Sequence, residues 1–356
     1  MTENTGTTRT SSNTHKNLVR AVFWPALLIV LFVVAWRLFQ ASTPVVTPRI
    51  AFITADSTPY WDGVLEGARA AADQYGVTLE VVTPNGDRDS QERALSDLDP
   101  ALTDGVAISP VDAVRQTARL RQVAKSMSLV TVDSDSELSN RVCFVGMNNH
   151  DAGRKAATLI KDMLGDTPGR VLILSGPLDK ANGRARREGL IDELQDRAAG
   201  ASSEPTPPES VLESDGFIVG PTLLDEIDPG AATAQLVEYL ESADELPNVI
   251  VGLYGYHAPA IVAALDQVRP DQQIRVIGFD AVPETLEAME RGAVQGVIAQ
   301  DQFSYGYESI RILAEAIRGA EYALPLNRRV EYPPVVVTND NLEPFLRESG
   351  RSSSGG

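Results

Sequence analysis

The 356-residue sequence has few of the residues that build disulfides and metal centres. It contains one cysteine, Cys143, and three histidines, His15, His150 and His257, which lie far apart in the sequence. A single cysteine excludes an intramolecular disulfide and a multi-cysteine metal site. The histidines also lack the spacing of metal ligands. We therefore expect Cys143 to be a small buried hydrophobe, the histidines to be structural, and the protein to use no cofactor or metal.

The common motifs of nucleotide-binding proteins and hydrolases are absent as well. The sequence has no G-x-x-x-x-G-K-[ST] phosphate loop, no G-x-G-x-x-G after the first apolar run and no G-x-S-x-G elbow. One alternative stays open, because the turn at residues 176–183 could receive a phosphate at the start of a helix. We expect a protein that is not an enzyme.

Basic residues are scarce relative to acidic ones. There are 31 Lys and Arg against 49 Asp and Glu, and the net charge is -18. A surface of this sign repels nucleic-acid phosphates and anionic membranes. The sequence therefore predicts no nucleic-acid partner.

The N-terminus departs from this charge balance. Residues 1–20 carry Arg9, Lys16 and Arg20 with one acid, and the uncharged run Ala21–Trp36 follows. Residues up to 39 extend the run toward the ~20 residues that span a bilayer, and the preceding positive charge places the N-terminus in the cytoplasm. We predict a basic cytoplasmic tail at 1–20, an uncleaved signal anchor or transmembrane helix at 21–39 and a tether at 40–48. A cleaved signal peptide is the alternative.

The rest of the chain alternates between apolar runs and segments with helical spacing. The strand candidates, of four to seven residues, are Arg49–Thr54, Val77–Thr83, Gly105–Ser109, Leu129–Val132, Arg141–Val145, Arg170–Ser175, Phe217–Gly220, Asn248–Leu253, Ile274–Phe279 and Val294–Ala299. Such alternation predicts βαβ units and parallel sheets. The series is long for one sheet, so we predict an α/β protein with two doubly wound lobes. Residues 197–214 read as a surface loop, and residues 347–356 as a disordered tail.

Polar and aromatic residues follow the predicted strands in both halves of the chain. Open parallel sheets bind ligands at the carboxyl ends of their strands. Carboxylates accept hydrogen bonds from hydroxyls, Arg and Gln donate to oxygens, and aromatic faces cover apolar C–H surfaces. These types suit a polyhydroxy ligand. The candidate binding residues are Thr58, Tyr60, Trp61, Asp133, Ser134, Arg184, Tyr256, Asp280 and Gln300.

Each of these residues also has a purely structural interpretation. An aspartate at a strand end, such as Asp280, can cap the following helix. Tyr60 and Trp61 can pack under a neighbouring loop. Arg184 can be a solvated helix charge, as we expect for Arg186 and Arg187. The repetition of candidates at corresponding strand ends in both halves favours a binding site.

Several segments together resemble a known family. They are STPYWDGVLEGARAAADQYG, DGVAISPVD, LVTVDSD, NHDAGRKAA, NGRARREGL, VIGFDAVPE and GVIAQD. The part from about Arg49 to Leu342 is similar to the ribose-type periplasmic sugar-binding proteins, which share their fold with the effector domains of LacI-like repressors. Residues 197–220 would be an insertion. The resemblance implies a type I periplasmic-binding-protein fold with two lobes and a three-strand hinge.

The resemblance also assigns roles. It implies that Tyr60 and Trp61 stack on the sugar beside Thr58, that Asp133, Arg184 and Asp280 bind hydroxyls, and that Gln300 lies at the hinge. The chain departs from the ribose branch at Ser134, where that branch has arginine, and at Tyr256, where it has asparagine, which puts ribose itself in doubt. Crossings near Met147, Gln300 and Glu331 would divide the chain into lobes of 48–147 plus 301–331 and 148–300 plus 332–346.

The function that the resemblance implies is transport. A monomeric, periplasmic or otherwise extracytoplasmic protein would close around a small sugar or polyol and deliver it to an ABC permease. The alternative is an anchored sensor that signals to a membrane kinase or chemoreceptor. A LacI-like repressor is disfavoured, because an apolar run stands where a DNA-binding module would be and the charge is wrong for DNA.

Overall fold

The computed structural model describes residues 25, 28–33, 36, 47–165, 167–198, 205–214, 216–320 and 324–348. Residues 1–46 and the compact part at 47–356 form separate units. In the first unit the described residues 25, 28–33 and 36 are helical, and the remainder of the predicted tail, anchor and tether up to 46 lies outside the described residues. Among the described residues, no helix combines the length and the hydropathy needed to cross a membrane.

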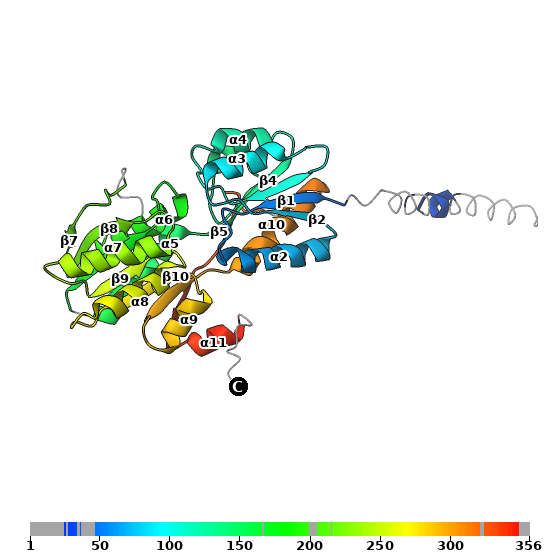
Figure 1. Cartoon of the computed structure of the whole chain (residues 1–356). Coiled ribbons are helices and arrows are strands. Elements are labelled where there is room, and N and C mark those ends of the chain that lie inside the picture. The colour runs from blue at the N-terminus through cyan, green and yellow to red at the C-terminus, as the bar shows by residue number, and fades with distance from the viewer. Residues whose placement is uncertain are drawn as a thin grey trace, which may run out of the picture. The chain divides into compact units, whose positions relative to one another are not determined.

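The first sheet of the compact part is entirely parallel and has the order β12-β5-β4-β3-β1-β2. Its strands are β1 (Arg49–Ile53), β2 (Thr78–Val82), β3 (Gly105–Ile108), β4 (Ser128–Val132), β5 (Cys143–Met147) and β12 (Arg329–Tyr332). The helices that pack with it are α2 (Tyr60–Tyr75), α3 (Arg88–Asp97), α4 (Thr117–Val123) and α10 (Gln302–Ile317), and a short 3₁₀ helix covers Glu137–Ser139. We call this sheet and its helices the first lobe (Figure 1).

The second sheet has the order β13-β11-β10-β9-β6-β8-β7, with antiparallel strands at both edges. Its strands are β6 (Gly169–Ser175), β7 (Leu212–Ser214), β8 (Phe217–Leu224), β9 (Val249–Gly252), β10 (Arg275–Phe279), β11 (Gly296–Ala299) and β13 (Val335–Thr338). Its helices are α5 (Asn149–Leu164), α6 (Ala181–Leu194), α7 (Pro229–Ser242), α8 (His257–Val268), α9 (Pro283–Glu290) and α11 (Leu342–Glu348). We call this group the second lobe. The chain passes between the lobes after β5, after β11 and after β12.

The two parallel-sheet lobes confirm the predicted fold class. Each of the ten predicted strands overlaps an observed one. Most of them are continuous apolar runs, as expected for strands that helices cover on both faces. The predicted loop at 197–214 needs correction, since its last residues form β7. The predicted disorder of the tail is wrong for Arg347 and Glu348, which end α11; residues 349–356 lie outside the described residues. Cys143 is fully buried, as expected.

In each lobe, one pair of helices crosses at glycines. A Cβ on Gly67 of α2 would lie 1.9 Å from the Phe303 carbonyl oxygen of α10. A Cβ on Gly189 of α6 would lie 2.0 Å from the His150 carbonyl oxygen of α5. These contacts are backbone to backbone, so only glycine permits them. Both α2 and α6 carry cavity residues near their N-termini, and the crossings thereby set the position of the site.

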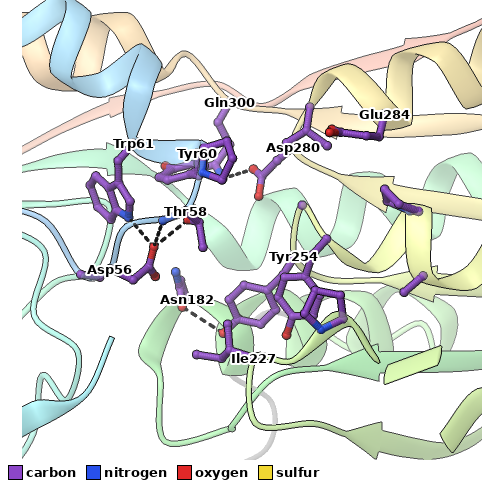
Figure 2. Close-up of a pocket in the computed structure, with 18 of the residues that line it drawn as sticks. Asp56, Thr58, Tyr60, Trp61, Asn182, Ile227, Tyr254, Asp280, Glu284 and Gln300 are labelled. Atoms are coloured by element: carbon purple, nitrogen blue, oxygen red, sulfur yellow. Dashed lines mark hydrogen bonds between the residues drawn. The ribbon is translucent and has the colours of Figure 1, made fainter. Parts of the chain in front are cut away.

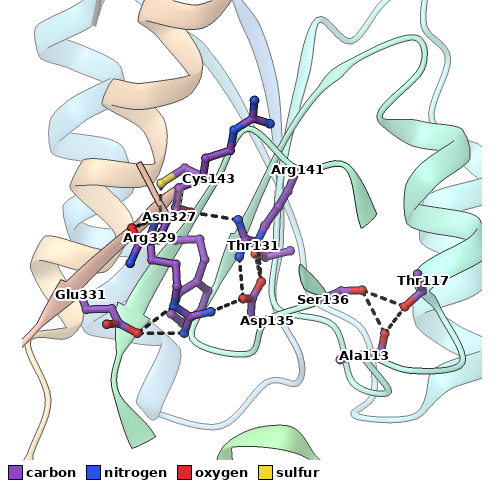
Figure 3. A network of polar contacts seen from close by, with 12 residues as sticks. Ala113, Thr117, Thr131, Asp135, Ser136, Arg141, Cys143, Asn327, Arg329 and Glu331 are labelled. Carbon is purple, nitrogen blue, oxygen red and sulfur yellow. Dashed lines mark hydrogen bonds and ion pairs between the residues drawn. The ribbon is translucent and has the colours of Figure 1, made fainter. Parts of the chain in front are cut away.

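A network of charged side chains ties β12 to the first lobe (Figure 3). The Arg141 guanidinium, 4% exposed, donates to both carboxylate oxygens of Asp135 at 2.6 and 2.7 Å. Arg329 of β12 donates to Asp135 at 2.6 Å and pairs with Glu331 at 2.8 Å. Its guanidinium lies 4.4 Å from the centre of the Phe144 ring of β5. The last strand of the first sheet is therefore held by ionic contacts as well as by its ladder to β5.

Candidate functional site

A cavity of about 610 Å³ lies at the carboxyl ends of strands from both lobes. Figure 2 shows its lining residues converging from the loops after β1, β8, β9, β10 and β11 and from the start of α6. This is where an open α/β sheet is expected to bind a ligand. Of the nine predicted binding residues, those that line the cavity are Thr58, Tyr60, Trp61, Asp133, Tyr256, Asp280 and Gln300.

The loop after β1 forms an aromatic wall of the first lobe. The indole Nε1 of Trp61 donates to Asp56 at 3.0 Å, and Asp56 also accepts from the backbone N–H and hydroxyl of Thr58. The Tyr60 and Trp61 rings meet edge to face, with centroids 5.1 Å apart. Asp56 thus fixes this wall, and both rings take part in lining the cavity rather than only packing beneath a loop.

Asp133 and Asp280 occupy equivalent positions in the two lobes. Each follows a central strand, and each has the left-handed backbone conformation, with φ of 62°. The N–H of Asp133 donates to Val145 on the next strand, as that of Asp280 does to Ile298. The capping interpretation fails for Asp280, because Val282 is the N-cap residue of α9. A non-glycine residue in this conformation costs of order 1–3 kcal/mol, and such residues cluster at functional sites.

Both carboxyl groups are buried and accept hydrogen bonds from neutral groups. Asp133 accepts from the Tyr60 hydroxyl at 3.0 Å and from Asn182 Nδ2, in the second lobe, at 3.3 Å. Asp280 accepts from Gln300 Nε2. Burial is the main reason that the pKa of each carboxyl is raised; Arg186 opposes this rise, and Asp280 adds to it at Asp133.

The cavity arginine is Arg186, and the prediction of Arg184 is wrong in position. Arg184 does not line the cavity, and its guanidinium donates to the Leu178 carbonyl at 3.0 Å. Arg186 is 1% exposed and is held by Asn149 Oδ1 and the Leu253 carbonyl, both at 2.8 Å. Burial acts to lower the pKa of its guanidinium, but the nearby acidic groups, led by Asp280 and Asp133, outweigh burial and raise it.

The reason for this shift of two residues is the face of α6 that packs on α5. Gly189 makes the close contact with α5, and Arg186, one turn before it, is on the buried side of the helix. Arg187 is also buried, at 2% exposed, where it donates to Thr222 and to carbonyls of the segment after residue 204. The expectation that Arg186 and Arg187 are solvated is therefore wrong.

Ser134 is a second predicted residue that does not line the cavity. It is 6% exposed, and its N–H bonds to the Val132 carbonyl two residues back. The left-handed turn at Asp133 sends the chain away from the cavity immediately after this aspartate. The end of β4 therefore presents only Asp133 to the cavity, and Ser134 is buried within the first lobe.

The loop after β9 forms the facing aromatic wall. The Tyr254 and Tyr256 rings are stacked with centroids 6.0 Å apart, and both line the cavity. The Tyr256 hydroxyl donates to Asp225 at 2.6 Å, so this residue presents its ring rather than a free hydroxyl. His257 accepts from the Tyr254 N–H at Nδ1 and lies 2.8 Å from Asp225 through Nε2. Burial lowers the pKa of His257, which therefore donates to Asp225 as a neutral imidazole and has a structural role.

The sequence interpretation missed six polar or aromatic lining residues, which are Asp56, Asn182, Arg186, Thr233, Tyr254 and Glu284. Two of them had a usable signal, because Asp56 and Tyr254 lie within two residues of the ends of predicted strands. Asn182 and Arg186 are four residues apart and share one face of a helix. No group of three or more potential metal ligands occurs among the described residues. The cavity combines hydrogen-bond acceptors, one guanidinium donor and aromatic faces.

Comparison with known proteins agrees with this architecture. The family model described as "Periplasmic binding protein domain" matches residues 50–321. The D-allose-binding periplasmic protein of Escherichia coli K12 is 24% identical over 290 residues, which cover 78% of this chain and 86% of that protein.

Two solved structures have similar folds. An ABC transporter solute-binding protein from Burkholderia graminis C4D1M, in complex with D-arabinose, has a TM-score of 0.74 and 25% identity, covering 84% of this chain and 98% of that one. One from Bacillus halodurans C-125 with bound myo-inositol has a TM-score of 0.73 and 18% identity, covering 86% and 100%.

Proposed function

Since this chain belongs to the periplasmic binding protein domain family, we propose that it is an extracytoplasmic solute-binding protein that captures a small sugar or polyol. One observation carries this proposal: aromatic rings from both lobes and two buried carboxylates surround the same cavity as a buried guanidinium. The allose, arabinose and inositol named for its relatives are of the same chemical class. We assign the protein no catalytic role, and delivery to an ABC permease follows from its relatives.

Binding would use the side chains that line the cavity in the positions described above. Asp133 and Asp280 accept hydrogen bonds from ligand hydroxyls, because each retains free lone pairs. Arg186 donates to a ligand oxygen, and the ring faces of the two walls cover the apolar C–H surface. A ligand that contacts both lobes favours their closed arrangement by its differential affinity for it. The three interlobe crossings are the places where the chain can bend.

We also propose that the N-terminal segment 21–39 is retained as an anchor in the cytoplasmic membrane. A tether of residues 40–48 reaches only ~30 Å when extended, so the binding unit would stay close to a permease. After cell fractionation, the protein should sediment with the membranes and should not be extracted from them by high salt. N-terminal sequencing should show that residues 1–39 are still present. A soluble product that begins after residue 39 would instead show cleavage.

A ligand screen tests the proposed function. The full-length protein, purified in mild detergent, would be unfolded thermally against pentoses, hexoses, inositols and amino sugars. A ligand at 100 times its Kd adds about 2.7 kcal/mol of stability, which raises the Tm of a domain of this size by several degrees. The binding species should elute as a monomer. A folded protein with no response to any member of the panel would refute the sugar or polyol assignment.

The control for this screen is Asp280→Asn. Burial raises the pKa of Asp280, so its ionised form costs stability above that pKa, and the cost disappears as the pH falls toward the unfolded-state pKa. Asparagine removes the charge and tolerates the left-handed conformation. We expect the variant to be more stable by about 0.5–2 kcal/mol at pH 7 and to show a smaller ligand-induced shift. Unchanged binding would remove Asp280 from the site.

A further inference from the structure

The described residues that line the cavity carry more acids than bases. Asp133 and Asp280 lie deep in it, 7% and 4% exposed, with the single guanidinium of Arg186. Nearer the opening are Asp56 and Glu284. The ammonium of Lys180 interacts electrostatically with Asp56 and Asp133, although Lys180 is not a lining residue. Among the lining residues, four carboxyl groups therefore share the cavity with one guanidinium, and in its deep part acids exceed bases by one.

The deep carboxylates have no ionic partner within bonding distance. Among the described residues, neither Asp133 nor Asp280 forms a salt bridge, and their hydrogen bonds come from Tyr60, Ser109, Asn182, Gln300 and a backbone N–H. Arg186 uses Nε and Nη1 for Asn149 and Leu253 instead. Buried carboxylates are normally paired with a cation. Because Asp133 and Asp280 both line the cavity, a cationic group of a bound ligand could take the place of that partner.

Two further features point to a ligand that brings both charge and oxygen atoms. Arg186 is almost fully buried and lines the cavity, yet its Nη2 has no hydrogen-bond partner among the described residues. This donor calls for a ligand oxygen. The rings of Tyr60, Trp61 and Tyr254 supply the electron-rich faces on which organic cations bind.

We propose that the ligand is an amino sugar or aminocyclitol, whose protonated amine binds against Asp133 and Asp280 while a ring oxygen or hydroxyl accepts from Arg186. This inference rests on the proposed function and narrows it to one substrate class. The positive charge of the ligand's amine would offset the excess of one carboxylate in the deep part of the cavity. The raised pKa values of Asp133 and Asp280 fit this assignment, because a bound ammonium would stabilise both ionised forms.

Matched ligand pairs test the inference by titration calorimetry on the full-length protein at pH 7. Each pair is an amine and its hydroxyl twin: glucosamine and glucose, galactosamine and galactose, and an aminodeoxyinositol and myo-inositol. Charge-assisted hydrogen bonds are roughly twice as strong as neutral ones, so we expect the amine of the preferred pair to bind about tenfold tighter or better. Its N-acetyl derivative should lose this advantage, since acetylation removes the charge.

The outcomes separate the inference from the function beneath it. A hydroxyl twin that binds as tightly as its amine, or tighter, overturns the inference and leaves the sugar or polyol function standing. No binding by any member overturns the inference; it overturns the sugar or polyol function as well only when the thermal screen, which includes pentoses, also gives no response. The amine-to-hydroxyl affinity ratio should also fall about tenfold in Asp133→Asn or in Asp280→Asn. It should be unchanged in Asp62→Asn, which alters an exposed α2 carboxylate outside the cavity; a ratio unchanged in all three variants would contradict the inference.

Discussion

Replacing Gly189 with alanine is expected to destabilise the protein by about 1–3 kcal/mol or more. The added Cβ would lie 2.0 Å from the His150 carbonyl oxygen and 2.8 Å from that carbonyl carbon, so α5 and α6 must move apart. Alanine also favours the helix by roughly 1 kcal/mol over glycine, but the clash is with backbone that cannot rotate away. Because α6 carries Asn182 and Arg186, its displacement should weaken ligand binding as well.

Urea unfolding of the full-length variant measures the stability loss, and calorimetry with a ligand found in the screen measures binding. The matched control is Gly220→Ala in β8, where the added Cβ would have its nearest neighbour at 3.5 Å, an ordinary contact. This control should keep native affinity. If Gly189→Ala were as stable as the control, the close crossing of α5 and α6 would not exist in solution.

Asp135→Ala should produce the second large effect, a loss of about 3–5 kcal/mol. It removes the partner of Arg141, whose guanidinium is 4% exposed and would become a buried charge without a carboxylate. Arg329 loses one of its two acidic partners and keeps Glu331. The penalty comes from leaving a charge buried, and it exceeds the net value of the original pair.

Chemical denaturation distinguishes this loss from a surface effect when Glu331→Ala is measured beside it. The Arg329–Glu331 pair is about 30% exposed on both sides, and such pairs contribute about 0–1 kcal/mol. We expect Asp135→Ala to lower the unfolding midpoint several times more than Glu331→Ala. Equal midpoints for the two variants would mean that Arg141 reaches solvent when Asp135 is absent.

Most of the parallel strands could be predicted from the sequence because they are buried between helices. Each is an apolar run such as RIAFI or SLVTV, and its length and turn residues mark both ends. The strands β7, β12 and β13 were missed because all three are short edge strands with partly exposed side chains. β12 and β13 pair with strands far away in the sequence, and no local pattern records that pairing. β7 pairs with the neighbouring β8, but it has only three residues.

The cavity residues also differ in how far the sequence predicts them. Asp133, Asp280 and Gln300 directly follow strands. In each sheet, parallel pairing places the carboxyl ends of neighbouring strands side by side, so the sequence alone locates these residues. Arg186 reaches the cavity from the second turn of a helix. Which of the three arginines of α6 faces inward is decided by the contact of Gly189 with α5, a feature of tertiary packing. The position of a side chain on a strand end is thus local information, whereas its position on a helix face depends on the partner helix.

The elements of the first lobe are not contiguous in the sequence. The first lobe begins at β1, but its helix α10 and its edge strand β12 follow the whole of the second lobe's series from α5 to β11. At about 5–20 residues per second, a ribosome needs roughly eight to thirty seconds to make that intervening segment. During this interval α2 has no α10 to pack against. The lobe that starts first therefore stays incomplete until β12 has been made, after which only β13 and α11 of the second lobe remain. Until then we expect its exposed apolar surface to need the protection of chaperones.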